Sequence, residues 1–144
     1  MGALHDRTFS ELTPQELYAI LRLRAEVFVV EQTSAYLDPD GRDLEPTARQ
    51  LWVEDDEGAV TATARVLDDG DARRIGRIAT RADQRGKGIA AQLIEHFLAT
   101  TNAPWRLSAQ SHLADWYATF GFTVDGPEYD DGDGIPHVPM LRRE

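Results

Sequence analysis

The chain has 144 residues and carries 25 acidic against 15 basic side chains, a net charge of −10. This length suffices for a single domain over residues 1–144 with a hydrophobic core of its own. The acidic balance argues against a nucleic-acid partner, and the absence of cysteine excludes disulfides and thiolate nucleophiles. No apolar run reaches the length of a membrane span and no signal-peptide pattern is present, so we expect a cytoplasmic protein without a membrane partner.

The N-terminal part is expected to form a short strand over residues 4–9 and then a helix. Thr13 is the predicted N-cap, Pro14 the first helical residue, and Glu16 closes a capping box. Apolar side chains that recur at helical spacing extend this helix to about residue 30.

A polar connector over residues 33–48 separates this helix from two strand-like runs. Residues 38–43 partly match the spacing of a calcium loop, but the glutamate and glycine positions that such a loop requires are missing, which favours ordinary turn chemistry. The runs 50–54 and 60–67 flank Asp-Asp-Glu-Gly, and the second run alternates and is β-branched. Together they predict an antiparallel hairpin.

The centre of the chain combines a strand, a glycine-rich turn and a helix start. Residues 75–80 are predicted as a buried strand, and apolar residues from Ile89 onward recur at helical spacing. The first-turn N–H groups of a helix lack intrahelical partners and carry roughly half a positive charge together. Gly86 and Gly88 allow close approach of an anion, while Arg85 and Lys87 add charge, which predicts a pyrophosphate site here.

The C-terminal part adds a strand over residues 105–110, a short helix over 113–120 that ends at Gly121, and a pair of strands over 122–129 and 135–141. This order of elements predicts an α+β fold. Its sheet would be mixed and mainly antiparallel, flanked by helices, with the strand, phosphate loop and helix at its centre.

Two familiar nucleotide sites do not fit the glycine-rich turn. The residues from Gly86 to Ala91 match the dinucleotide fingerprint GxGxxA, but residues 106–113 contain no acid that could hold a ribose, and the preceding strands are joined by tight turns. The phosphate loop of NTPases is excluded because no Gly-Lys-Ser/Thr follows at the required spacing.

The pattern Arg85-x-x-Gly88-x-Ala90, directly after a strand, resembles the acyl-CoA loop of the GNAT superfamily of N-acetyltransferases. Residues 116–122, with Tyr117 four positions before Gly121, resemble the tyrosine-containing element of that superfamily, and the order of elements agrees over nearly the whole chain. Four further stretches resemble the ElaA-type branch, namely residues 23–32, 75–79, 109–113 and 133–137.

This resemblance implies acetyl-CoA as co-substrate and a direct transfer of its acetyl group to a primary amine of a small molecule or a lysine. Backbone amides of Gly86, Lys87, Gly88, Ile89 and Ala90 would hold the pyrophosphate together with the Arg85 and Lys87 charges. The strand edge at Ile78, Ala79 and Thr80 would pair with the pantetheine arm. It would splay from strand 105–110, and a backbone N–H near Ala79 would polarise the thioester carbonyl.

The catalytic residues follow less directly from the resemblance. Tyr117 matches the tyrosine of the superfamily and is the expected acid for the departing thiolate. Glu31 is a candidate base because partial burial at an apolar helix end would raise its pKa, and Glu26 is a weaker candidate. His137 and His112 are further candidates. The four histidines show no metal-ligand spacing, so we expect no metal.

The acceptor and the assembly state are left open by the sequence. Asp38, Asp40, Asp43 and residues 130–133 lie in segments that border the acceptor side of such folds, where carboxylates would attract a cationic amine. A non-catalytic acyl-CoA-binding or sensing domain is one alternative. A second alternative is an acyl-homoserine lactone synthase, which residues 23–32 and the acidic loop also resemble. The resemblance also leaves a homodimer open.

Overall fold

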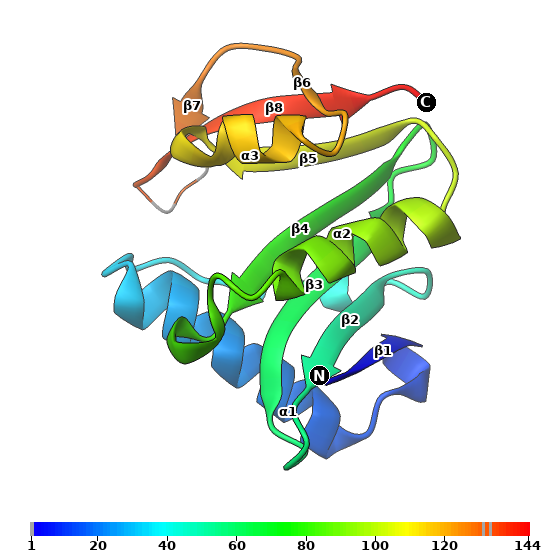
Figure 1. The fold of residues 1–144 in the computed structure, drawn as a ribbon, viewed down its shortest axis with the longest axis vertical. Coiled ribbons are helices and arrows are strands. Elements are labelled where there is room, and N and C mark those ends of the chain that lie inside the picture. Colours follow the sequence, from blue (N-terminus) through cyan, green and yellow to red (C-terminus); the bar gives the residue numbers. More distant parts are fainter. Residues whose placement is uncertain (1, 131, 133) are drawn as a thin grey trace.

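The computed structural model describes residues 2–130, 132 and 134–144. Its eight-stranded sheet has the order β1-β2-β3-β4-β5-β8-β6, and β7 pairs with β8 (Figure 1). The strands are β1 (Ala3–Thr8), β2 (Arg49–Glu54), β3 (Val60–Asp68), β4 (Arg73–Thr80), β5 (Trp105–Gln110), β6 (Thr123–Val124), β7 (Tyr129–Asp130) and β8 (Pro136–Arg142). All pairs are antiparallel except β4 with β5. The predicted mixed, mainly antiparallel sheet is confirmed.

Three α-helices accompany the sheet: α1 (Pro14–Arg24), α2 (Ile89–Thr100) and α3 (Ala114–Ala118). Short helical turns connect them to the strands: η1 (Phe9–Glu11), η2 (Ala25–Glu31), η3 (Arg42–Leu44), η4 (Ala82–Gln84) and η5 (Ser111–Leu113). In Figure 1, α2 crosses the front of the central strands and α1 lies behind them. No helix in the described part of the chain has the length and apolar character needed to cross a membrane.

The start of α1 follows the predicted capping box. The Glu16 amide donates to the Thr13 hydroxyl at 3.1 Å, and the Thr13 amide donates to the Glu16 carboxylate at 2.9 Å. The helix does not stay α-helical to residue 30, because the chain continues from Ala25 to Glu31 as a π-helix, η2. Such wide turns are frequent at functional sites because they change which side chains face a neighbour.

The core lies between α2 and the sheet. Leu93, Ile94 and Phe97 on α2 are fully buried against Ile75 of β4 and residues of β2 and β3. A smaller cluster on the other face joins Leu23 and Val27 to Ala79. The two clusters hold the central strands from both sides and so fix the position of β4.

The strands β4 and β5 pair only at one end. Arg73 lies opposite Trp105 and Arg74 opposite Arg106, and beyond these two pairs the strands part. On its other edge β4 carries a β-bulge, because Arg65 lies opposite Gly76 whereas Thr63 lies opposite Ala79. Bulges bend and twist a strand and are frequent next to active sites. The predicted splay is therefore present.

The C-terminal segment differs from the expected strand over residues 122–129. It forms two strands of two residues, β6 and β7, separated by Asp125–Glu128. Pro127 in this gap has no N–H to donate to a ladder, which explains the break. The predicted last strand is confirmed as β8, and Gly121 after α3 adopts the left-handed conformation (φ 89°).

Candidate active site

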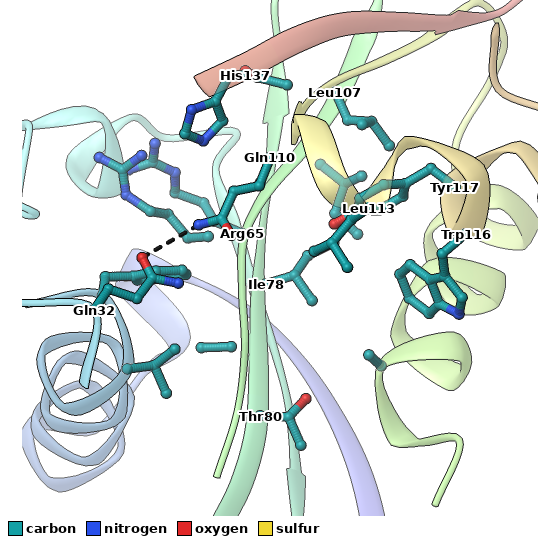
Figure 2. A pocket seen from close by; sticks show the side chains of 18 of the residues that line it. Gln32, Arg65, Ile78, Thr80, Leu107, Gln110, Leu113, Trp116, Tyr117 and His137 are labelled. Atoms are coloured by element: carbon teal, nitrogen blue, oxygen red, sulfur yellow. Dashed lines mark hydrogen bonds between the residues drawn. The ribbon is translucent and has the colours of Figure 1, made fainter. Parts of the chain in front are cut away.

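A groove of about 990 Å³ opens where β4 and β5 part. Side chains and backbone of both strands line it, together with the glycine-rich loop, the first turn of α2, helix α3 and the connector after η2. In Figure 2 the labelled Tyr117 and Trp116 lie on one side of this groove, and Arg65, Gln110 and His137 lie on the other. We call the part at the loop and α3 the loop half, and the part at Arg65 and His137 the far half.

The loop half is built mainly from backbone. Gly88 is the N-cap of α2 with φ 77°, and Gly86 has the same φ. A Cβ at either position would meet nothing within 4 Å, so the space above the loop is open. Since the first-turn N–H groups of α2 lack intrahelical partners, this arrangement fits an anion such as a pyrophosphate.

Most residues predicted for cofactor binding line the groove. These are Ile78, Ala79, Thr80, Arg85, Gly86, Gly88, Ile89 and Ala90. Lys87 is exposed beside Gln84 and is not among the lining residues. The edge of β4 at Ile78–Thr80 pairs with β3 on one side only, because β5 has already parted from it. That free edge can accept an extended chain as an added strand.

Tyr117 on α3 lines the groove between β4 and β5. Its side chain is 7% exposed, and its ring meets the Trp116 ring edge-on with centroids 4.9 Å apart. Burial raises the pKa of Tyr117 to about 12, so the phenol keeps its proton at neutral pH. A protonated hydroxyl at this place can donate a hydrogen bond or a proton to a group in the groove.

Glu31 does not have the environment expected of a base. Its carboxylate bonds the Arg85 guanidinium at 2.6 and 2.8 Å, and its side chain is 39% exposed. The hydrogen bond from Arg85 lowers the pKa of Glu31, whereas partial burial was expected to raise it. That expectation was wrong because Arg85, which is distant in sequence, lies beside the end of η2. Glu26 is exposed and does not line the groove.

His137 lies on β8 and lines the far half of the groove. It is 6% exposed, and its Nδ1 lies 2.7 Å from the carbonyl oxygen of Ile135. Because a carbonyl only accepts, Nδ1 donates in this contact, which orients the imidazole on the groove wall. His112 also lines the groove but is exposed in η5, the turn before α3.

Comparison with known proteins decides the family. The model for the acetyltransferase (GNAT) domain matches residues 10–143. The chain is 46% identical over 137 residues to a UPF0039 protein of Mycobacterium tuberculosis, covering 92% of this chain and 87% of that protein. It is 40% identical over 147 residues to protein ElaA of Escherichia coli, covering 95% and 94%. The chain belongs to the GNAT acetyltransferase family.

Solved structures agree with this assignment. An acyl-CoA N-acyltransferase from Pseudomonas aeruginosa superposes with a TM-score of 0.91 at 37% identity, over 99% of both chains. ElaA of E. coli superposes with a TM-score of 0.91 at 36% identity, over 99% of this chain and 100% of that one. The chain is thus an acetyltransferase with the GNAT fold, and its resemblance to ElaA is confirmed.

More distant structures share the fold alone. The AHL synthase LasI has a TM-score of 0.76 at 16% identity, over 99% of this chain and 90% of that one. An aminoglycoside 6'-N-acetyltransferase solved in complex with coenzyme A has a TM-score of 0.71 at 11% identity, over 96% of both chains.

The far half of the groove of this GNAT protein is held by ion pairs. Arg24, fully buried on α1, donates from Nε to Asp38 at 2.8 Å and from Nη1 to Asp43 at 2.7 Å. Arg65 on β3 donates to both oxygens of Asp40 at 2.8 and 2.9 Å. Burial by itself would raise the pKa of Asp43, but the Arg24 hydrogen bond and charge outweigh it and lower that pKa.

The expected approach lined with free carboxylates is therefore not what the structure shows. Asp38 and Asp43 are buried and paired, and Asp40 is paired with Arg65. Of residues 130–133, Asp131 and Asp133 lie outside the described residues. Each of these three carboxylates is paired with an arginine of the same chain.

Several groove residues were missed from the sequence. Gln110 on β5 donates to Gln32, after η2, at 3.2 Å, and Figure 2 shows this bond crossing the groove. Arg65 and Arg74 line the far half but carry no local motif. The available signal was the alternation of side chains along a strand. It places Arg65 and Arg74 on the face of the sheet opposite to that of their apolar neighbours Val66 and Ile75. Among the described residues, no group of three or more histidine and carboxylate side chains is arranged to hold a metal.

Proposed function

We propose that this acetyltransferase uses acetyl-CoA and transfers the acetyl group to a primary amine of a small molecule or a lysine by direct attack. The observation that carries the proposal is the parting of β4 and β5 after two residue pairs. It places an open strand edge, the anion-binding loop and the buried Tyr117 on one groove.

Each part of acetyl-CoA finds a matching surface. The N–H groups from Gly86 to Ala90 face the pyrophosphate, and both glycines leave room for it. The pantetheine arm runs along Ile78–Thr80 as an added strand. Its thioester then lies near Ala79 and Tyr117. Arg85 and Lys87 supply positive charge, and Arg85 does so while it stays paired with Glu31.

The chemistry needs one base and one acid. The amine nitrogen forms a bond to the thioester carbonyl carbon, the carbon–sulfur bond breaks, and its electron pair stays on sulfur. A backbone N–H near Ala79 stabilises the oxyanion that develops on the carbonyl oxygen. Tyr117 gives its proton to the thiolate, and a base takes one proton from the attacking nitrogen.

His137 is the base that we propose in place of Glu31. His137 lines the groove, and the contact of its Nδ1 with the Ile135 carbonyl orients the imidazole, the side chain that most often acts as a general base. Glu31 is held as an anion by Arg85, and the lowered pKa makes it a weak proton acceptor. His137→Gln is expected to lower kcat by roughly 10²-fold with little change in CoA affinity.

The test is ligand binding followed by turnover. Thermal unfolding is recorded with and without millimolar CoA and acetyl-CoA, and free thiol release is then followed with a panel of amines. A raised unfolding temperature and amine-dependent thiol release are expected. No thermal shift with either ligand would contradict the proposal.

The two alternatives give different results in the same assay. Stabilisation by CoA without acetyl transfer to any amine would favour a non-catalytic acyl-CoA-binding domain. Consumption of S-adenosylmethionine together with an acyl carrier protein would favour homoserine lactone synthesis, for which the likeness to LasI offers the fold alone.

A further inference from the structure

The far half of the groove presents arginine side chains. Four arginines and one aspartate from three separate segments line it. They are Asp40 and Arg42 from the connector, Arg65 from β3, and Arg74 and Arg77 from β4. The chain has a net charge of −10, yet four guanidinium groups gather on this wall, each of them paired with at least one carboxylate.

The balancing carboxylates lie mostly behind this wall. Asp38 and Asp43 are 4% and 9% exposed and do not line the groove. Asp69, which pairs with Arg42 and Arg74, does not line it either. The ion pairs therefore fix the arginines from the rear, and Arg74 keeps 34% of its side chain exposed whereas Arg65 keeps 5%.

Arg74 has donors to spare. It donates from Nε to Asp69 at 2.8 Å, and within the described residues its terminal nitrogens make no further hydrogen bond. Arg65 differs, because both of its terminal nitrogens donate to Asp40 and its side chain is 5% exposed. Arg74 is therefore the arginine that can donate to a ligand oxygen, and Arg65 adds positive charge beside it.

The wall has a hollow at Gly76. This residue lies opposite Arg65 in the β3–β4 register, and Arg74 and Arg77 flank it on β4. A Cβ at Gly76 would meet nothing within 4 Å. Space for a small group is thus present on the face of the sheet that carries Arg65 on β3 and Arg74 on β4.

We propose that Arg74 binds an anionic group of the acceptor above Gly76, beside the buried charge of Arg65, so that the acceptor is a small amine that also carries a carboxylate or a phosphate. The inference rests on the proposed function, since it names the substrate class of that site. Guanidinium groups match both anions because they donate two parallel hydrogen bonds. Elsewhere on the groove, β5 and β7 offer neutral polar groups from Ser108, Gln110 and Tyr129.

The experiment compares amines that differ by the anionic group alone. Lysine and cadaverine differ by one carboxylate, and glucosamine 6-phosphate and glucosamine differ by one phosphate. In each pair the anionic member is expected to have a kcat/KM at least about tenfold higher, as for a hydrogen bond to a charged group. The pair with the larger ratio identifies the anion. Equal or higher kcat/KM for the two amines that lack the anionic group, cadaverine and glucosamine, would overturn the inference.

Arg74→Gln tests the site, with Arg106→Gln as the matched control. Arg106 lies opposite Arg74 in the β4–β5 register, is 35% exposed against 34%, and pairs with Asp125, yet it does not line the groove. Arg74→Gln should raise the KM for the preferred anionic amine about tenfold or more and leave CoA binding unchanged, whereas Arg106→Gln should change neither. Arg74→Glu should shift the preference toward cadaverine. Equal effects of Arg74→Gln and Arg106→Gln would contradict the proposal.

Failure of the proposed function gives a different pattern. Binding of the amines to the protein saturated with CoA is measured by calorimetry, independently of turnover. Anionic amines that bind in an Arg74-dependent manner without any thiol release would leave the anion site standing and remove the transferase reaction. Thiol release with a preference for cadaverine would support the transferase reaction and remove the anion site.

Discussion

The two halves of the groove are built from different material. The loop half consists of backbone N–H groups, glycines and an unpaired strand edge, and its charged side chains are exposed. The far half consists of side chains from α1, the connector, β3 and β4, joined by ion pairs in which Arg24 has no exposed surface. One half presents main-chain groups to the groove, and the other presents guanidinium groups.

This difference predicts different sensitivities to mutation. A backbone site tolerates changes of side-chain charge but not an added Cβ at a left-handed position. A site of buried ion pairs tolerates little loss of charge, because the remaining partner stays buried without compensation. The following predictions test this contrast from the largest expected effect to the smallest.

Arg24→Met should have the largest effect on stability. It leaves Asp38 and Asp43 buried without their shared partner, which typically costs about 3–5 kcal/mol of unfolding free energy. Arg22→Met is the control, because Arg22 lies on the same helix but is exposed. Urea unfolding measures both variants. A similar loss for Arg22→Met, or no loss for Arg24→Met, would show that the far half does not depend on its buried charges.

Tyr117→Phe should lower kcat by about 10²-fold, which corresponds to about 2.7 kcal/mol of activation free energy. CoA affinity should be retained, because the phenyl ring keeps the packing against Trp116. Since the pKa of Tyr117 is raised to about 12, the group stays protonated and should cause no alkaline fall in kcat below about pH 11. Tyr18→Phe on an exposed tyrosine is the control. Unchanged turnover would remove Tyr117 from the mechanism.

Gly88→Ala tests the loop half directly. At φ 77° an added Cβ costs about 1–2 kcal/mol of stability, and it also occupies the space of the pyrophosphate. Gly58→Ala is the control, because Gly58 has φ 82° and equally open surroundings but lies in the β2–β3 turn. Both variants should lose similar stability, whereas CoA affinity should fall about tenfold or more, equivalent to about 1.4 kcal/mol, for Gly88→Ala alone. A parallel loss of CoA affinity in Gly58→Ala would argue for a general effect of destabilisation.

The same contrast explains what could be predicted from the sequence. The capping box at Thr13, the N-cap at Gly88 and the tyrosine after β5 are fixed by residues within a few positions of each other, so their patterns are readable locally. The far half depends on pairs such as Arg24 with Asp43 and Arg65 with Asp40, 19 and 25 positions apart. Charge pattern alone does not say which partners meet, because the pairing is set by the packing of α1 and the connector on the sheet.

The bulge in β4 escaped prediction for a related reason. It places Arg77 at φ 50° and adds one residue opposite β3. An extra residue shifts the inward and outward alternation of the side chains that follow it. The sequence of residues 73–80 does not distinguish such a bulge from a regular strand with polar positions. The environment of Glu31 was misjudged in the same way, since its partner Arg85 lies 54 positions further on.

Glu31→Gln should have the smallest effect, and it tests the ion pair between Glu31 and Arg85. The pair with Arg85 is exposed, at 39% and 44%, so its loss should change the unfolding free energy by less than about 1 kcal/mol. If His137 is the base, kcat stays within about twofold of the wild type, whereas loss of a general base would cost roughly 10²-fold or more. CoA should bind at least as tightly, because the Glu31 carboxylate no longer offsets the Arg85 charge beside the pyrophosphate. A large fall in kcat with unchanged CoA affinity would return Glu31 to the role of base and would mean that Arg85 releases it once the co-substrate is bound.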